Sequence, residues 1–569
     1  MPTKTAHNNL AFPVLTPDQI ATASRFASGP PQIFPSGELV YGIGDREPPT
    51  WLLLQGTLNA FHHEGLTGET RIVTHRAGQF TGELSQLAAR PAIVGGRAGP
   101  EGCVAIPFDA AQLRALLAGS AEVGEILMRA FILRRTMLLD GGRGGTALIG
   151  VPASPAVVRL RNFITRNGYP HFVLDASLDP EAHALVDRLG VQHADLPLVV
   201  CPSGVVLKNP SELEVGIRLG ITPDLIPGAI YDVAIVGAGP SGLAAAVYAA
   251  SEGLRTIVLD EHAIGGQAGA SARIENYLGF PAGISGQALA DRASSQALKF
   301  GAEIAIPLAV AGLDRSDDCE AGGPCLDLSL VDGRVLKAKA VIVASGARYR
   351  RPNIANLSDY EGSSVSYWAS AVEARLCEGA EIALVGGGNS AGQAVVFLAP
   401  FVSQLHLVIH REDLSNTMSR YLSDRIAALS NVRLHVRSSI TALVGDAATG
   451  LKAAVFRDIA TGVLSHRPLR HVFLFVGAEP NTSWMQGCAQ TDRSGFLLTG
   501  ADAWATNPIS VAHGAFLQTS MTGVFAIGDV RSGSTKRIAA AVGEGAAVVQ
   551  QVHKYLTSQF PKKSGTDAR

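Results

Sequence analysis

Short apolar runs separated by glycine-centred turns fill the first part of the chain, as in WLLLQGTL and RIVTHRAGQFTGEL. This rhythm is typical of strands in a small all-β unit. Over residues 111–139 the apolar positions instead recur at helical spacing,. We therefore predict a β-roll with helices over residues 1–140, in which 111–139 form a single helix.

A second texture follows a glycine-rich joint at residues 141–145. Residues 146–222 alternate as strand, helix, strand, helix and strand, from TALIGV to LPLVVC,. From Tyr231 to about Leu556 the pattern becomes strongly α/β, and it contains two related strand–turn–helix openings, at 232–260 and 381–411. The fold class predicted is therefore multidomain, with a β-roll, a small α/β domain and a module of two Rossmann-type dinucleotide-binding domains.

The first opening has every part of a dinucleotide site. A buried strand over 232–236 runs into Gly237-Ala238-Gly239-Pro240-Ser241-Gly242 and a helix, and the next strand ends in Asp260. In this pattern the first glycine permits the tight turn, the second lets backbone approach a pyrophosphate, and the third allows helix and strand to pack closely. The terminal acid stands where a carboxylate accepts a ribose hydroxyl. The alternative is a purely structural glycine turn.

The second opening places Gly386-Gly387-Gly388-Asn389-Ser390-Ala391 after a strand, and its second strand ends at His410-Arg411. Two such sites in one chain suggest one dinucleotide held permanently and one that exchanges. A flavin enzyme reduced by a nicotinamide needs this arrangement, because hydride passes between two stacked rings.

Composition and charge exclude several other classes of protein. The net charge of −2 gives no electrostatic footprint for nucleic acid or an anionic membrane,. The 6 cysteines form no C-x-x-C and are too scattered for a disulfide scaffold, and no metal site is predicted,. The start lacks a basic segment followed by an apolar run, and the apolar stretch at 232–250 is broken by glycines,. We expect a soluble cytoplasmic protein.

From Tyr231 to Leu556 the chain resembles the low-molecular-weight thioredoxin reductases, of the pyridine nucleotide-disulfide oxidoreductase class. The matching motifs are G-A-G-P-S-G (237–242), G-G-Q (265–267), E-N-Y-L-G-F-P (275–281), V-A-S-G-A (343–347), G-G-G-N-S-A (386–391), F-V-G-A-E-P-N-T (475–482) and G-V-F-A-I-G-D-V (523–530). The resemblance implies an FAD-binding domain at 229–352 and 480–556, and an inserted NAD(P)-binding domain at 353–479 that swings to deliver hydride.

The resemblance also assigns cofactor residues. For FAD it implies Gly237, Gly239, Pro240, Ser241, Gly242, Asp260, Gly266, Gln267, Asn276, Gly346, Gly528, Asp529 (to a ribityl hydroxyl), Arg537 and Ile538. For NAD(P) it implies Gly386, Gly388, Asn389, Ser390, Ala391, His410 and Arg411. NADPH-preferring relatives place further arginines after the second strand, whereas Glu412 and Asp413 follow here. We predict NADPH, and NADH stays open because either acid could accept a ribose 2′-hydroxyl.

One family feature is missing. In the family a Cys-x-x-Cys follows a V-S-Y-like run, and this chain has Trp368 and Ala371 at the two cysteine positions. Dithiol exchange needs one thiolate to attack and a second to resolve, so these residues cannot perform it. Cys377 is six residues too late and is predicted to be a buried apolar cysteine,. No catalytic side chain is assigned, because the flavin itself carries the chemistry.

The two N-terminal segments carry their own resemblances. Residues 146–222 resemble a thioredoxin/glutaredoxin-like domain without redox cysteines, with Leu196-Pro197 where the family has a cis-proline; an unrelated α/β unit is the alternative. Residues 1–140 resemble a cyclic-nucleotide-binding domain for cAMP or cGMP as an effector. That family's glutamate and arginine would be Glu83 and Arg97, within Gly82-Glu83 and Arg97-Ala98. The alternative is a structural cap in which Glu83 and Arg97 form a buried ion pair.

We therefore predict an FAD-dependent NAD(P)H oxidoreductase with a small-molecule or protein electron acceptor, and a homodimer as in the family. A ferredoxin/flavodoxin–NADP reductase-like enzyme is the closest alternative. A cyclic-nucleotide or redox sensor with incidental turnover is the alternative from another class.

Overall fold

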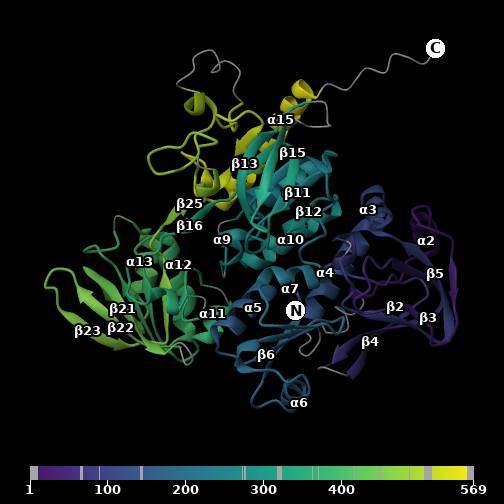
Figure 1. The fold of residues 1–569 in the computed structure, drawn as a ribbon, viewed down its shortest axis with the longest axis horizontal. Helices are drawn as coiled ribbons and strands as arrows, with labels where there is room; N and C mark the ends of the chain where they lie inside the picture. The colour runs from purple at the N-terminus through teal and green to yellow at the C-terminus, as the bar shows by residue number, and fades with distance from the viewer. Residues whose placement is uncertain are drawn as a thin grey trace.

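The computed structural model describes residues 10–64, 68–88, 90–140, 145–271, 273–274, 277–316, 323–361, 363–369, 371–415, 417–446, 450–485, 487–504 and 515–560. Figure 1 shows these residues as four units arranged around separate sheets.

The first unit is an antiparallel roll followed by two helices. Its sheet has the order β1-β5-β3-β4, with β2 beside β5. The strands are β1 (Gln32–Phe34), β2 (Leu39–Tyr41), β3 (Thr50–Glu64), β4 (Gly68–Arg76) and β5 (Gly95–Phe108), and α2 (Pro17–Ser24) precedes them.

The prediction of one helix over 111–139 is wrong, because the structure has α3 (Ala110–Gly119) and α4 (Ala121–Asp140). Ser120 adopts an extended conformation (φ −126°, ψ 103°), and its hydroxyl accepts the Val123 N–H at 3.4 Å. A serine in this position favours a helix start over a continuous helix.

The second unit is a four-stranded sheet in the order β7-β6-β8-β9. Strand β6 (Thr146–Gly150) is parallel to β7 (His171–Asp175) and antiparallel to β8 (Leu198–Val200), which pairs with β9 (Val206–Lys208). The helices are α5 (Pro155–Arg166), α6 (Pro180–Arg188) and α7 (Glu212–Arg218). The peptide bond between Leu196 and Pro197 is cis. The sequence missed β9 and α7, which are short and carry little apolar periodicity.

The third unit is a seven-stranded sheet in the order β12-β11-β10-β15-β14-β13, with β26 beside β15. The strands are β10 (Ile230–Val236), β11 (Thr256–Leu259), β12 (Glu303–Ala305), β13 (Val310–Ser316), β14 (Cys325–Leu330), β15 (Val335–Val343) and β26 (Val524–Ala526). Helices α8 (Pro240–Ser251) and α15 (Ile538–Gln559) pack against it, and α10 (Gly286–Lys299) packs against α8.

The fourth unit has a parallel sheet in the order β17-β24-β18-β19-β20 and a smaller antiparallel sheet in the order β21-β22-β23. The first sheet contains β17 (Val365–Ser366), β18 (Glu381–Val385), β19 (Gln404–Val408), β20 (Val432–His435) and β24 (His471–Leu474). The second contains β21 (Ser438–Asp446), β22 (Gly450–Asp458) and β23 (Leu464–Pro468). Its helices are α11 (Ala371–Leu376), α12 (Asn389–Leu398) and α13 (Arg420–Ala427).

A two-stranded ribbon connects the third and fourth units. The chain leaves the third unit through β16 (Ala347–Tyr349) and returns through β25 (Ala478–Pro480), and these strands pair antiparallel. The packing on the two sides of the ribbon differs. One hydrophobic cluster runs through the first three units and includes Phe131, Leu160 and Val233. The fourth unit has its own clusters, drawn from residues 354–474.

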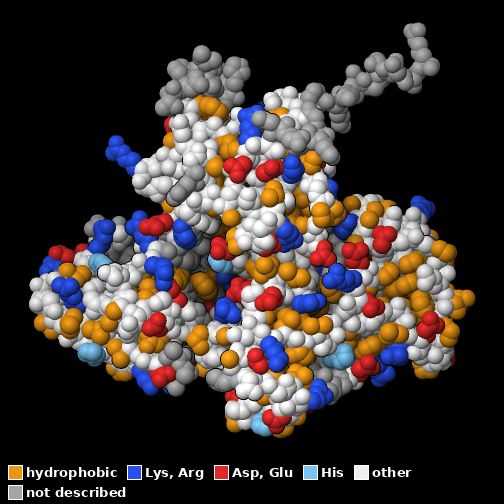
Figure 2. Space-filling view, in the orientation of Figure 1, with side chains coloured by type: hydrophobic (Ala, Val, Ile, Leu, Met, Phe, Trp, Pro, Cys, Tyr) orange, Lys and Arg blue, Asp and Glu red, His pale blue; other side chains and the backbone are white. Residues whose placement is uncertain are grey.

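The face of the molecule seen in Figure 2 carries no dominant charge. Figure 2 shows lysine, arginine, aspartate and glutamate side chains interspersed over the visible face. No helix within the described ranges combines the length and apolar character that crossing a membrane requires.

Candidate functional site

The first glycine turn joins β10 to α8. At Gly237 φ is +116°, and a Cβ there would lie 2.2 Å from the Ala344 carbonyl oxygen. A Cβ on Gly242 would lie 1.8 Å from the Gly237 oxygen. Both positions therefore require glycine for the turn itself. By contrast, a Cβ on Gly239 would meet nothing within 4 Å, which leaves bare backbone beside the α8 N-terminus at Pro240.

Asp260, which follows β11, supports this turn. Its Oδ2 accepts the Ala238 N–H at 2.8 Å, and its Oδ1 accepts the N–H groups of His262 and Ala263 at 2.8 and 3.1 Å. The carboxylate thus lies beside the glycine turn, where the sequence places it. Its predicted contact with a ribose hydroxyl stays a prediction.

A second glycine turn closes against the first. Gly265 donates its N–H to the Ala238 oxygen at 2.8 Å, and Gly266, at the start of α9 (Gly266–Gly269), has φ +53°. A Cβ on Gly266 would lie 3.1 Å from the Gly239 Cα. The Gln267 side chain donates to the Ala347 oxygen of β16. Asn276 lies outside the described residues.

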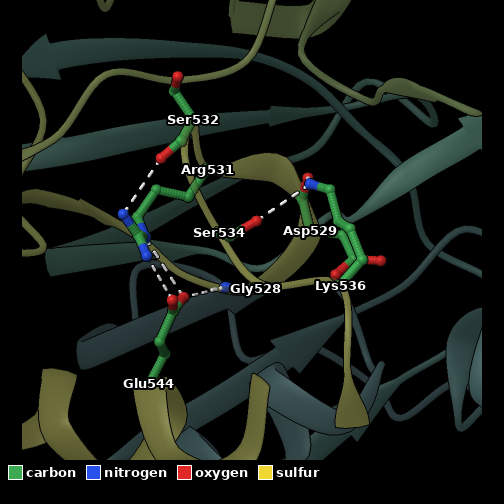
Figure 3. Close-up of polar contacts among 7 residues, drawn as sticks. All are labelled: Gly528, Asp529, Arg531, Ser532, Ser534, Lys536 and Glu544. Carbon is green, nitrogen blue, oxygen red and sulfur yellow. Dashed lines mark hydrogen bonds and ion pairs between the residues drawn. The ribbon is translucent and has the colours of Figure 1, made fainter. Parts of the chain in front are cut away.

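The C-terminal part of the site is shaped by a partly buried carboxylate (Figure 3). Glu544, on α15, accepts the Gly528 N–H at 2.7 Å and pairs with the Arg531 guanidinium at 2.5 Å. Gly528 has φ +70°, and a Cβ on it would lie 2.6 Å from the Ser241 Oγ. Glu544 therefore fixes the turn η7 (Gly528–Val530) against α8 and α15.

Asp529 lies half-buried on this turn. Burial raises the pKa of its carboxyl group, while the nearby Lys536 acts in the opposite direction and Glu544 adds to the rise. The Lys536 ammonium donates to the Asp529 backbone oxygen at 2.5 Å and to the Ser534 hydroxyl at 3.0 Å. A hydroxyl of a bound ligand would stabilise a carboxylate in these surroundings.

Two further predicted positions present backbone without a side-chain cover. Gly346 has φ +65°, and a Cβ on it would meet nothing within 4 Å. Helix α15 begins after Arg537 without a side-chain cap, so the amides from Ile538 onward have no capping side chain,. With Gly239 and the α8 N-terminus, these positions provide the bare backbone and free N–H groups that a dinucleotide requires. The residues present fit such a ligand.

The second site repeats this geometry between β18 and α12. Gly386 has φ +144°, and a Cβ there would lie 2.4 Å from the Phe475 oxygen, whereas a Cβ on Gly388 would meet nothing within 4 Å. The side chain of Asn389 accepts the Ser419 N–H at 2.7 Å. Ser390 follows it in the first turn of α12, and Ala391 is buried.

His410 and Arg411 lie exposed just after β19. The two acids that follow are engaged by the protein. Glu412 pairs with Arg437, and Asp413 accepts the N–H and hydroxyl of Ser415 at 2.9 and 2.6 Å.

The positions of the missing dithiol have a structural use. The Trp368 indole N–H donates to Glu373 at 2.9 Å, and the Arg166 guanidinium lies 5.2 Å from the ring centre. Ala371 is the first residue of α11. No sequence pattern points to Arg166, Glu373, Arg531 or Glu544, because the role of each depends on how separate elements pack together.

Among the described residues, Cys377 and Cys201 lie in surroundings that disfavour a thiolate. Cys377 is buried as predicted, and burial raises its pKa to about 12. Burial also raises the pKa of Cys201 to about 11. Cys325 is disulfide-bonded, which the sequence analysis did not anticipate, and Cys319 lies outside the described residues.

The proposed cyclic-nucleotide residues are not brought together. Glu83 is 5% exposed and pairs with Arg135 of α4 at 3.3 Å. Arg97 lies on β5 with its side chain 43% exposed, 4.0 Å from Glu69. The alternative of a buried Glu83–Arg97 pair is therefore wrong. Gly82 has φ +86°, and its carbonyl oxygen accepts a hydrogen bond from the Arg134 guanidinium. Ala98 is buried.

The glycine turns at 237–242 and 386–391 each join a parallel strand to a helix. Both lie in a part of the chain that matches known proteins. The family model for pyridine nucleotide-disulphide oxidoreductases matches residues 231–545. The chain belongs to this family. It is thus a flavin-dependent NAD(P)H oxidoreductase, and FAD and NAD(P)H are the cofactors expected.

The similar proteins agree on this part of the chain. The chain is 31% identical over 334 residues to a thioredoxin reductase of Listeria innocua, covering 58% of this chain and 94% of that protein. It is 31% identical over 336 residues to alkyl hydroperoxide reductase F of Escherichia coli, covering 57% of this chain and 58% of that protein. The match thus spans just over half of the latter relative.

Solved structures show the same fold. Thioredoxin reductase of Lactococcus lactis matches with a TM-score of 0.50 and 26% identity, and that of T. acidophilum with 0.50 and 28%. Each match covers 58% of this chain and 99% of the other.

Proposed function

We propose that this protein oxidises NAD(P)H and passes the electrons from its flavin to an external acceptor without a cysteine pair at the family's dithiol position. The observation that carries the proposal is the environment of Trp368, whose indole is fixed by Glu373 and covered by Arg166. A thiolate relay at this position is replaced by a packed aromatic side chain. Cys377 and Cys201 are buried with raised pKa values, which disfavours thiolates there,.

FAD, when bound, supplies a ring that takes up hydride and releases electrons singly or in pairs. The chain's own residues would hold it. The turn at Gly237–Gly242 and the α8 N-terminus would bind the pyrophosphate. Asp529 would accept a hydrogen bond from a hydroxyl of the ribityl chain. The first turn of α15 would present its backbone amides to the flavin ring.

The pyridine nucleotide would bind at the Gly386–Ala391 turn, and we infer that NADPH is preferred over NADH. Because Glu412 and Asp413 are engaged by Arg437 and Ser415, neither is poised for a ribose 2′-hydroxyl. The exposed Arg411 beside His410 would instead meet a 2′-phosphate,.

The unit at 146–222 would then be a docking or spacer module. We infer a thioredoxin/glutaredoxin-like fold for 146–222 from its strand order and its cis-proline. We infer a cyclic-nucleotide-binding-like roll for 1–140 from its sheet and following helices. The burial of Glu83 against Arg135 gives no support to cAMP or cGMP as a ligand there.

An anaerobic acceptor screen tests the function. Wild-type protein should lose its flavin absorbance on adding NADPH, and it should then reduce at least one acceptor among ferredoxin, flavodoxin, a soluble quinone and oxygen. Thioredoxin should stay oxidised. The matched variant is Trp368→Cys/Ala371→Cys, which restores the two cysteines at the start of α11. If wild type reduced thioredoxin as fast as this variant, the proposal would fail.

The same screen separates the alternatives. Turnover confined to ferredoxin or flavodoxin would assign a ferredoxin/flavodoxin–NADP reductase-like activity. Bleaching without turnover on any acceptor would contradict the enzyme and favour a redox sensor.

A further inference from the structure

Arg166, the last residue of α5, contacts two different units of the molecule. Its Nη2 donates to the Gly266 carbonyl oxygen at 3.1 Å, on the turn that closes against Gly239. Its guanidinium carbon also lies 5.2 Å from the centre of the Trp368 ring, which belongs to the fourth unit. One side chain of the second unit therefore lies between the two dinucleotide-binding units.

The Trp368 indole is oriented for this contact by a residue of its own unit. Its N–H donates to Glu373 at 2.9 Å, and Glu373 is buried on α11. Arg161, also on α5, is close enough for its charge to interact with Glu373. Figure 1 shows α5 lying next to α11. Arg166 thus contacts the segment that replaces the dithiol, and the charge of Arg161, on the same helix, acts on it from nearby.

The other side of α5 is fixed to the flavin-binding unit. Leu160, Phe163 and Ile164 belong to the hydrophobic cluster that runs through the first three units. The Gln287 side chain, on α10, donates to the Arg166 backbone oxygen at 3.0 Å and to Asp291 at 2.8 Å. Arg166 therefore belongs to the three units that share one hydrophobic cluster, and Trp368 to the unit that has its own core.

We propose that Arg166 and Trp368 form a latch that holds the NAD(P)-binding unit against the flavin-side turn. The position of the family's dithiol has become a docking point for the chain's own 146–222 unit. This inference rests on the proposed function, because the latch matters to turnover when the NAD(P)-binding unit rotates about the β16–β25 ribbon. Arg166 is then a positioning residue, which sets how readily the two units separate.

Hydrogen exchange on the holoenzyme tests the latch directly. We expect Arg166→Ala to speed exchange of the amides at 266–269 and 365–369 by roughly threefold to tenfold, the range of one partly buried cation–π contact. Arg188→Ala is the matched control, because Arg188 is an exposed arginine in the last turn of α6 on the same unit. It should leave both segments at the wild-type rate.

Flavin reduction provides the second readout. At saturating NADPH, Arg166→Ala should raise the limiting rate of flavin bleaching about threefold or more, since a restraint on rotation is removed. The half-saturating NADPH concentration should not change. The bleaching rate of Arg166→Lys should fall between those of wild type and Arg166→Ala. An ammonium keeps the charge over the ring but lacks the planar fork that also reaches Gly266.

Unchanged exchange at both segments in Arg166→Ala would overturn the latch, and so would faster exchange spread over the whole molecule. If Arg166→Ala does not fold, Trp368→Leu replaces it with the same expected pattern. A wild-type protein that NADPH fails to bleach would refute the proposed function alone, because the exchange comparison does not depend on bleaching.

Discussion

At the scale of single residues, the turn proposed to bind FAD is held by one carboxylate with two partners. Glu544 accepts the Gly528 N–H and pairs with Arg531, and the two side chains are 16% and 12% exposed. The glycines around it could be predicted, because their spacing along the chain follows from the local turn. Glu544 and Arg531 could not, because their role comes from the approach of α15 to η7.

Replacing Glu544 by glutamine should destabilise the protein by about 2 kcal/mol, because a partly buried charged hydrogen bond to Arg531 is lost while an acceptor for Gly528 remains. FAD should dissociate about tenfold more readily from a distorted turn. Urea unfolding and release of flavin fluorescence measure the two effects. The control is Glu125→Gln, whose pair with Arg129 is exposed and should cost less than about 1 kcal/mol,. Equal effects of the two substitutions would contradict the role of Glu544.

At the scale of elements, the strands of the fourth unit carry histidines that the sequence did not single out, and His406 and His471 are buried. His406 lies on β19, His435 ends β20 and His471 begins β24. Burial lowers the pKa of His471 to about 4, and burial together with the neighbouring His406 lowers the pKa of His435 to about 4. The sheet therefore contains neutral histidines that resist protonation.

This predicts an acid-sensitive sheet. A histidine with a lowered folded pKa takes up its proton more readily when unfolded, so its contribution is complete above the unfolded pKa of about 6.5 and is lost as pH falls toward 4. For His471 the full loss is about 3 kcal/mol. Urea unfolding at pH 7 and pH 5 should show a smaller pH dependence in His471→Gln than in wild type. An identical pH dependence would contradict the assignment.

The helices and strands show where apolar periodicity is enough to predict secondary structure. The strands and helices of 146–222 from TALIGV to LPLVVC can be predicted because apolar runs and helical spacing mark them directly. The helix over 111–139 is predicted whole because its periodicity continues across residue 120. The break depends on the local cap at Ser120, which periodicity does not register,.

At the scale of the whole molecule, three units share one hydrophobic cluster and the fourth has its own. Units that share a core unfold together, whereas a unit with a separate core can unfold alone.

Calorimetry of the apoprotein should therefore resolve two transitions. One should coincide with the transition of the isolated segment 353–479, which contains both clusters of the fourth unit. Adding NADPH should shift this transition upward, because ligand binds the folded unit. A single transition for the full chain, with no folding of the isolated segment, would contradict this division.

The sequence by itself determined the two glycine turns, their strands and helices, and the absence of cysteines at 368 and 371. These are local properties. A turn or a strand period is decided by residues that are neighbours in the chain, and a missing thiol is read from the residue itself. Only the tertiary structure decided that Glu83 faces Arg135 rather than Arg97, that Glu544 shapes the turn at Gly528, and that Arg166 lies over Trp368. These contacts join residues on separate elements, and their partners are chosen by how the units pack.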